Sequence, residues 1–306
     1  MGNYKVGHMV SVKKAVFPVA GLGTRFRPVT SAVPKEMLPV VDKPLIDYAI
    51  EEAVDAGITD LIFVVSRDKE IIVKYLSDKA NIKAIVEGRA RSVGSKLRND
   101  SGLPRLNIEF VSQEEPLGLG HAILCAEKAV GGDPFAVVLP DDLILSEVSC
   151  LAQMLEQHRE VGGNFLAIVE VEPHQTEMYG IVKVDEFTHG LLKVLGMTEK
   201  PSAETAPSNL AIVGRYILGA EIFKVLRQQA AGSGQEIQLT EAMDKLLIQQ
   251  DFYGLRFSGT RYDCGEKVGL LEANIAYFLR RTDLRTRARK AIEGFVLKGP
   301  KKEDDK

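Results

Sequence analysis

An apolar run that ends in a glycine turn is the feature that most constrains how this chain folds. Residues 16–20 predict a buried strand, and Gly21 and Gly23 follow it directly. Glycine lets the backbone bend tightly and lie close to a ligand. Arg25 and Lys35 come next, and their charges suit phosphate oxygens. The segment therefore predicts a strand followed by a phosphate-binding loop.

The spacing of this loop excludes two common phosphate-binding motifs. A dinucleotide-binding fingerprint needs a third glycine at position 26, where Phe26 stands, and a Walker loop needs Gly-Lys-Ser/Thr, which is absent. Pro34 and Pro39 stiffen the chain around Lys35 and give its side chain a defined direction. Glu36 either orients Lys35 or provides its counter-charge.

Strand and helix patterns alternate after the loop. Residues 45–54 are apolar at helical spacing between Pro44 and Gly57, which are typical of a helix start and a helix end, and residues 61–65 predict the next buried strand. Further strands are predicted at residues 107–111, 136–139, 165–171, 180–184, 210–218 and 252–257, and helices at 121–129, 150–159, 220–229, 239–249 and 267–281. This order predicts an α/β fold with a doubly wound, mostly parallel, mixed sheet.

The sequence shows no repeat or linker that would divide the chain, so we expect a single domain over residues 9–295. Residues 1–8 are polar and patternless and are interpreted as a vector-derived leader before Met9, and residues 301–306 are expected to be disordered. A basic helix predicted at residues 282–300 is a candidate for contacts with another subunit, in a dimer or tetramer of identical chains.

Composition and charge exclude several classes of protein. The formal net charge of −3 gives no field that would attract nucleic acid. No apolar run approaches the roughly 20 residues of a membrane-spanning helix. The three cysteines, Cys125, Cys150 and Cys264, are odd in number and widely spaced, which disfavours a disulfide framework and a Cys-x-x-Cys metal site. We therefore expect a cytoplasmic protein with no nucleic-acid or membrane partner.

Polar side chains follow three of the predicted strands. In an open parallel sheet, ligands lie beyond the carboxyl ends of the strands, which draws attention to Asp141, Asp142, Gln113 and Asp263. Asp142 and Asp263 could together hold Mg²⁺, because this ion usually takes one or two carboxylates and fills its other positions with water and substrate phosphates. Adjacent aspartates after a strand are also typical of a turn or a helix start.

Gln113 is a candidate for reading a pyrimidine base. Its carboxamide can donate to one ring atom and accept from the neighbouring one, which complements N3–H and O4 of uracil, whereas cytosine presents the reverse pattern. Thymine is identical to uracil at this edge. The amide can rotate, so the preference depends on what fixes it. The alternative is a surface polar residue, and His121 is interpreted as a helix-start residue.

The string PVAGLGTRFRPVTSAVPKEMLP at residues 18–39 resembles the sugar-1-phosphate nucleotidyltransferases, and the resemblance runs from about Lys14 to Arg281. It implies a Rossmann-like nucleotidyltransferase fold. It also implies transfer of a uridylyl group from UTP to α-D-glucose 1-phosphate, with Mg²⁺ as the cofactor. The chain departs from the family at Cys264, where threonine is commoner, and at residues 66–105.

The resemblance also implies a role for each site residue. It makes Arg25 and Lys35 the catalytic cations beside the triphosphate, and Asp142 and Asp263 the metal ligands. The implied nucleotide-binding residues are Ala20, Gly21, Gly23, Glu36, Gln113, Gly118 and Asp141, and the implied sugar-phosphate-binding residues are Gly180, Glu199, Lys200 and Val213.

Three alternative functions stay open at this point. A thymidylyltransferase for the same sugar phosphate would differ in its nucleotide. A non-catalytic relative that binds a nucleotide sugar would regulate another enzyme, although the presence of Arg25, Lys35, Asp142 and Asp263 argues against it. A metal-dependent glycosyltransferase fits the adjacent aspartates and leaves the Lys35 loop unexplained.

Overall fold

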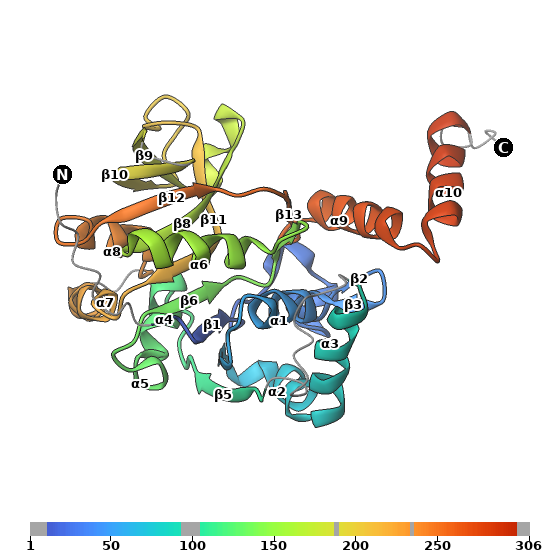
Figure 1. The fold of residues 1–306 in the computed structure, drawn as a ribbon, viewed down its shortest axis with the longest axis horizontal. Helices are drawn as coiled ribbons and strands as arrows, with labels where there is room; N and C mark the ends of the chain where they lie inside the picture. Colours follow the sequence, from blue (N-terminus) through green and yellow to red (C-terminus); the bar gives the residue numbers. More distant parts are fainter. Residues whose placement is uncertain (1–10, 93–104, 187–189, 233–235, 299–306) are drawn as a thin grey trace.

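The computed structural model describes residues 11–92, 105–186, 190–232 and 236–298. Nine strands of these residues form one sheet, in the order β5-β4-β1-β6-β11-β8-β12-β10-β9 (Figure 1). In chain order the strands are β1 (Lys14–Pro18), β4 (Asp60–Val65), β5 (Asn107–Ser112), β6 (Phe135–Val138), β8 (Asn164–Glu170), β9 (Gly180–Glu186), β10 (Leu191–Glu199), β11 (Leu210–Leu218) and β12 (Phe252–Arg256). Two-stranded sheets are formed by β7 (Asp142–Leu145) with β13 (Thr260–Asp263), and by β2 (Pro39–Val40) with β3 (Lys43–Pro44).

Helices cover both faces of the large sheet and bury two separate cores. Along β1, Ala15 and Phe17 point into the first core and Val16 into the second, because successive side chains of a strand alternate between faces. The first core contains α1 (Leu45–Asp55), α2 (Glu70–Ser77), α3 (Lys79–Ser92) and α6 (Cys150–Val161). The second contains α4 (Leu119–Cys125), α5 (Glu127–Val130), α7 (Ile222–Gly232) and α8 (Leu239–Leu246).

The predicted α/β fold with a mixed sheet is confirmed, but the sheet is not mostly parallel, because four of its eight neighbouring strand pairs are antiparallel. Parallel pairing joins β5, β4, β1 and β6 into one half of the sheet and joins β8 to β12. Between these parts lies β11, which is antiparallel to β6 on one side and to β8 on the other. The antiparallel pair β9 and β10 completes the far edge.

Several elements escaped the sequence analysis. The strand β10 was missed because its register shifts between Val194 and Gly196, which breaks the alternation of buried and exposed positions. The short strands β7 and β13 were not predicted. The helices α2 and α3 lie in the segment that departs from the family.

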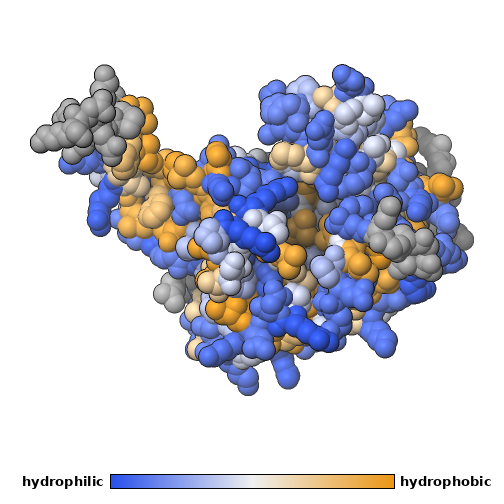
Figure 2. Space-filling model, turned by 180° about the vertical axis from the view of Figure 1, so that it is seen from behind, coloured by the Kyte–Doolittle hydropathy of each residue, from blue (hydrophilic) through white to orange (hydrophobic). Residues whose placement is uncertain are grey.

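The last described residues form two helices that project from the body, α9 (Lys267–Arg280) and α10 (Arg285–Lys298) (Figure 1). Figure 2 shows hydrophobic residues gathered on this arm, and Phe295 and Val296 of α10 are strongly exposed. A helix was predicted here, and its contact with another subunit stays a prediction. The proposed leader at 1–8 and the tail at 301–306 lie outside the described residues. Within the described ranges, no helix is both long and apolar enough to cross a membrane.

Candidate active site

The loop between β1 and α1 folds back on itself through short 3₁₀ turns, η1 (Thr24–Phe26), η2 (Val29–Ser31) and η3 (Lys35–Met37). Gly23 has φ 62°, the left-handed region that favours glycine, and its carbonyl accepts a hydrogen bond from Thr30 Oγ1 at 2.8 Å. A Cβ atom on Gly21 would lie 3.6 Å from Cε of Lys35. The glycine turn and Lys35 are therefore neighbours in space, as the sequence predicted.

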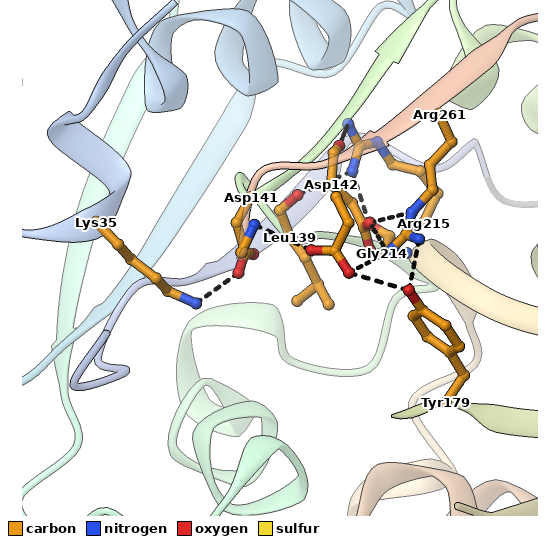
Figure 3. A network of polar contacts seen from close by, with 10 residues as sticks. Lys35, Leu139, Asp141, Asp142, Tyr179, Gly214, Arg215 and Arg261 are labelled. Atoms are coloured by element: carbon orange, nitrogen blue, oxygen red, sulfur yellow. Dashed lines mark hydrogen bonds and ion pairs between the residues drawn. The ribbon is translucent and has the colours of Figure 1, made fainter. Parts of the chain in front are cut away.

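Lys35 and Asp141 form an ion pair, with Nζ 2.6 Å from Oδ2 (Figure 3). Burial alone would lower the pKa of Lys35, but the charges of Asp141 and Glu36 outweigh burial and raise it. Burial opposes ionisation of Asp141 in the same way, yet Lys35 holds the pKa of that carboxyl below its ordinary value. Both groups are therefore charged. Arg25 is exposed and makes no ion pair with the described residues.

Glu36 pairs with Lys69, a residue that the sequence analysis did not single out. Lys69 Nζ lies 3.1 Å from Glu36 Oε2, and both side chains are buried. Burial raises the pKa of Glu36, and the charges of Lys35 and Lys69 oppose the rise. Oε1 of Glu36 is buried and has no hydrogen bond within the described residues. Lys69 lies in the short turn η4 (Arg67–Lys69), and no local pattern marked it.

Asp142 and Asp263 face each other across the pair of strands β7 and β13, as the metal-site hypothesis requires. Arg261 lies between them. Its Nη2 forms ion pairs with Asp142 Oδ1 and, at 3.2 Å, with Asp263 Oδ2. Its Nη1 donates to the hydroxyl of Tyr179 at 2.9 Å, and that hydroxyl donates to Asp263 Oδ2 at 3.0 Å (Figure 3).

The outer oxygens of the two aspartates are held by the backbone. Gly214 N–H donates to Asp142 Oδ2 at 2.7 Å, and Gly265 N–H donates to Asp263 Oδ1 at 3.0 Å. A Cβ on Gly214 would lie 2.7 Å from Asp142 Oδ2, so this position has no room for a side chain. The inner oxygens are thereby turned toward one shared cation.

This donor set fits Mg²⁺. Both inner ligands are carboxylate oxygens, which hard cations prefer, and they already converge on one positive group. Burial raises the pKa of Asp142, while Arg261 opposes the rise and Asp263 adds to it. The described residues contain no cluster of three or more metal-ligating side chains, so water and substrate phosphates would have to complete the coordination.

Gln113 lies just after β5 and is only 5% exposed, so the alternative that it is a surface residue is wrong. Its Nε2 donates to the Gly118 carbonyl at 3.2 Å and lies 3.0 Å from His121 Nδ1. Because a carbonyl can only accept, the amide nitrogen must face Gly118, and Oε1 is left available. From the sequence, His121 was predicted only to start a helix, and its contact with Gln113 was not predicted.

The same sheet edge brings the loop and Gln113 together. Ser66 Oγ donates to the carbonyl of Ala20 at 3.3 Å, and Gln113 N–H donates to the carbonyl of Val65 at 2.8 Å. Gly118 has φ 96°, and a Cβ there would lie 2.3 Å from Glu236 Cγ, so only glycine fits. The residues predicted to bind the nucleotide therefore lie beyond β1 and β5, with Asp141 beyond β6.

Glu199 and Lys200 lie where β10 ends, opposite Gly180 at the start of β9. Lys200 Nζ is 3.3 Å from Glu199 Oε1, and a Cβ on Gly180 would lie 3.4 Å from Glu199 Oε2. Lys200 has φ 46°, which is uncommon for a residue with a side chain, and its N–H donates to the carbonyl of Tyr179 at 3.0 Å. Val213 is buried in β11 beside Gly214. Tyr179 thus connects the predicted sugar residues to the aspartates.

Comparison with known proteins agrees with this arrangement. Residues 14–278 match the Nucleotidyl transferase family. The chain is 42% identical over 272 residues to UTP–glucose-1-phosphate uridylyltransferase 1 of Staphylococcus saprophyticus, which covers 89% of this chain and 94% of the relative. It is 40% identical over 291 residues to the UTP–glucose-1-phosphate uridylyltransferase of Bacillus subtilis, and the match covers 95% of this chain and 99% of that relative.

Two solved structures share the fold at substantial identity. A UDP-glucose pyrophosphorylase complexed with UDP-glucose has a TM-score of 0.79 and 39% identity, covering 88% of this chain and 100% of the other. A UTP-bound UGPase from Acinetobacter baumannii has a TM-score of 0.77 and 36% identity, and the match covers 92% of this chain and 98% of the other. The resemblance found in the loop at residues 18–39 is confirmed over most of the chain. This chain therefore belongs to the nucleotidyl transferase family, which includes these uridylyltransferases.

Proposed function

We propose that this chain transfers a uridylyl group from UTP to α-D-glucose 1-phosphate, giving UDP-glucose and pyrophosphate. One observation carries the proposal: Lys35 pairs with Asp141, and the adjacent Asp142 joins Asp263 and Tyr179 through Arg261. This network adjoins both the glycine loop and the Glu199 end of β10. The relatives that are named for this reaction support the choice of substrates.

The reaction is an in-line displacement at phosphorus. An oxygen of the sugar phosphate bonds to the α-phosphorus of UTP, the bond to the bridging oxygen breaks, and pyrophosphate leaves with that oxygen and its negative charge. Lys35 and Arg25 donate to phosphate oxygens and offset the charge that builds up on the leaving group. Lys35 must exchange Asp141 for phosphate in doing so. No covalent intermediate on a side chain is required.

Mg²⁺ is the cofactor we propose, with Asp142 and Asp263 as its protein ligands. When bound, it would neutralise phosphate charge and help to align the triphosphate. The convergence of both carboxylates on a single cation supports this assignment.

The base and the sugar are recognised by separate side chains. Gln113 Oε1 accepts from N3–H of uracil, because Nε2 is committed to Gly118. Glu199 accepts hydrogen bonds from hexose hydroxyls, and Lys200 neutralises the phosphate of the sugar. We also propose a cytoplasmic location, which the free cysteines support. An assembly of identical chains is proposed as well, and the exposed apolar side chains of α10 support it.

An assay of pyrophosphate release tests the reaction. Four nucleotides are each paired with several sugar phosphates, and UTP with glucose 1-phosphate should give the highest kcat/KM. A preference for dTTP would identify a thymidylyltransferase instead. Binding of UDP-glucose without any pyrophosphate release would identify a regulatory relative.

Gln113→Ala should reduce the preference for UTP over CTP by about tenfold, the worth of one buried hydrogen bond. The KM for glucose 1-phosphate should change less. The measurement is kcat/KM with each nucleotide, and Gln249→Ala, at an exposed position after α8, is the matched control. Unchanged selectivity in Gln113→Ala would remove Gln113 from base recognition.

Glu199→Ala should raise the KM for glucose 1-phosphate by about tenfold, because hydrogen bonds from the hexose to a carboxylate are lost. Calorimetric binding of UTP should stay close to normal. Glu186→Ala removes an exposed carboxylate from the other end of β9 and serves as the control. Loss of UTP binding in Glu199→Ala would contradict the placement of the sugar.

A further inference from the structure

We propose that Arg261 is an internal counter-charge whose guanidinium occupies the place of the divalent cation and leaves it when that cation binds. The inference rests on the proposed function for the role of Asp142 and Asp263. It assigns to Arg261 the part of an internal cation that neutralises the two carboxylates and competes with the metal.

The contacts of Arg261 are those of a bound cation. Its Nε and Nη2 both face Asp142 Oδ1, Nη2 also lies 3.2 Å from Asp263 Oδ2, and Nη1 donates to Tyr179 at 2.9 Å. The side chain is 12% exposed, similar to the 11% of Asp142 and the 19% of Asp263. The guanidinium carbon lies 4.9 Å from the centre of the Tyr179 ring. The space between the carboxylates is therefore filled by a positive charge.

The carboxylates do not depend on Arg261 for their position. Backbone N–H groups of Gly214 and Gly265 hold the outer oxygens, and pairing of β7 with β13 fixes the two aspartates opposite each other. Arg261 can leave without releasing either side chain. What its departure removes is the positive charge between two like charges, and a divalent cation restores that charge.

A neighbouring arginine shows the contrast. Arg215 is fully buried, and its donors reach both oxygens of Glu52 and the carbonyls of Leu139, Gly214 and Asp142 (Figure 3). Because these partners are mainly backbone, Arg215 is fixed in the fold. Arg261 instead binds the carboxylate oxygens that a metal ion needs. The guanidinium of Arg261 and the metal ion cannot both contact these oxygens without placing two positive charges side by side.

The test measures metal binding without nucleotide or sugar. Mn²⁺ is titrated into the full chain and followed by electron paramagnetic resonance. Arg261→Gln should bind Mn²⁺ at least about tenfold more tightly, because a competing charge at contact distance is gone. Arg256→Gln, which removes an exposed arginine from β12, should leave the affinity unchanged.

Thermal unfolding gives a second readout. In EDTA, Arg261→Gln should unfold at a lower temperature than the unmodified chain, because two facing carboxylates have lost their counter-charge. Saturating Mn²⁺ should raise the unfolding temperature of Arg261→Gln by more than it raises that of the unmodified chain. Arg261→Lys keeps the charge and should lie nearer to the unmodified chain in both measurements. It also provides a folded comparison should Arg261→Gln be unstable.

Unchanged or weaker Mn²⁺ binding in Arg261→Gln would overturn the inference. So would a gain in affinity that persists in Arg261→Gln combined with Asp142→Asn, because the metal would then bind elsewhere. Pyrophosphate release by the unmodified chain is measured separately. Pyrophosphate release tests the proposed reaction, and Mn²⁺ binding by Arg261→Gln tests the exchange of cations. Failure of either proposal can therefore be recognised independently of the other.

Discussion

Lys35→Ala should lower turnover by about 100-fold or more, the usual cost of removing a preorganised cation that faces charge developing in the transition state. Lys35 is held for this task by the glycine loop and by its ion pair with Asp141. The loss should appear in kcat of pyrophosphate release more than in the KM for glucose 1-phosphate.

The control for this substitution is Lys183→Ala, which removes an exposed lysine from β9 and should leave kcat unchanged. Circular dichroism is used to check that Lys35→Ala is folded. Near-normal turnover in a folded Lys35→Ala protein would refute the assignment of Lys35 to the triphosphate.

Asp142→Asn and Asp263→Asn should each cut activity by about 100-fold or more and raise the Mg²⁺ concentration needed for half-maximal rate. An amide keeps the shape of the carboxylate and loses the charge that hard cations favour. Binding of UDP-glucose, measured by calorimetry, should survive better than catalysis.

Chelation extends this prediction to the unmodified chain. EDTA should abolish pyrophosphate release, and added Mg²⁺ should restore it. Full activity in EDTA would defeat the mechanism with two aspartate ligands. Binding of UDP-glucose that needs Mg²⁺, without any pyrophosphate release, would instead favour a regulatory protein.

The parts of the site that follow a strand could be predicted from the sequence. A buried strand leaves a local signal, and so does a glycine, lysine or aspartate directly after it, which is why the loop with Lys35 and the Asp141–Asp142 pair were found. The helix α1 was predicted because its apolar spacing, its proline and its terminal glycine agree.

The partners that fix these groups could not be predicted in the same way. Lys69 reaches Glu36 and Tyr179 reaches Asp263 only once distant segments are packed together. Arg261 left one usable signal, because it lies two positions before Asp263 on a strand and so shares its face. His121 was visible in the sequence, but its contact with Gln113 depends on the turn at Gly118.

The insertion of β11 between the two parts of the sheet has a consequence for how the substrates are spaced. Arg215 of β11 pairs with Val138, just before the aspartates, while Ala211 pairs with Ile181, next to Gly180. The two positions are four residues apart, which is at most roughly 13 Å of extended chain, and the register of β11 against β8 shifts between Ile212 and Tyr216, which shortens the span. One covalently continuous strand therefore sets the separation between the place where the nucleotide is expected and the place where the hexose is expected. Alignment of the two reactants then depends on the geometry of one buried strand.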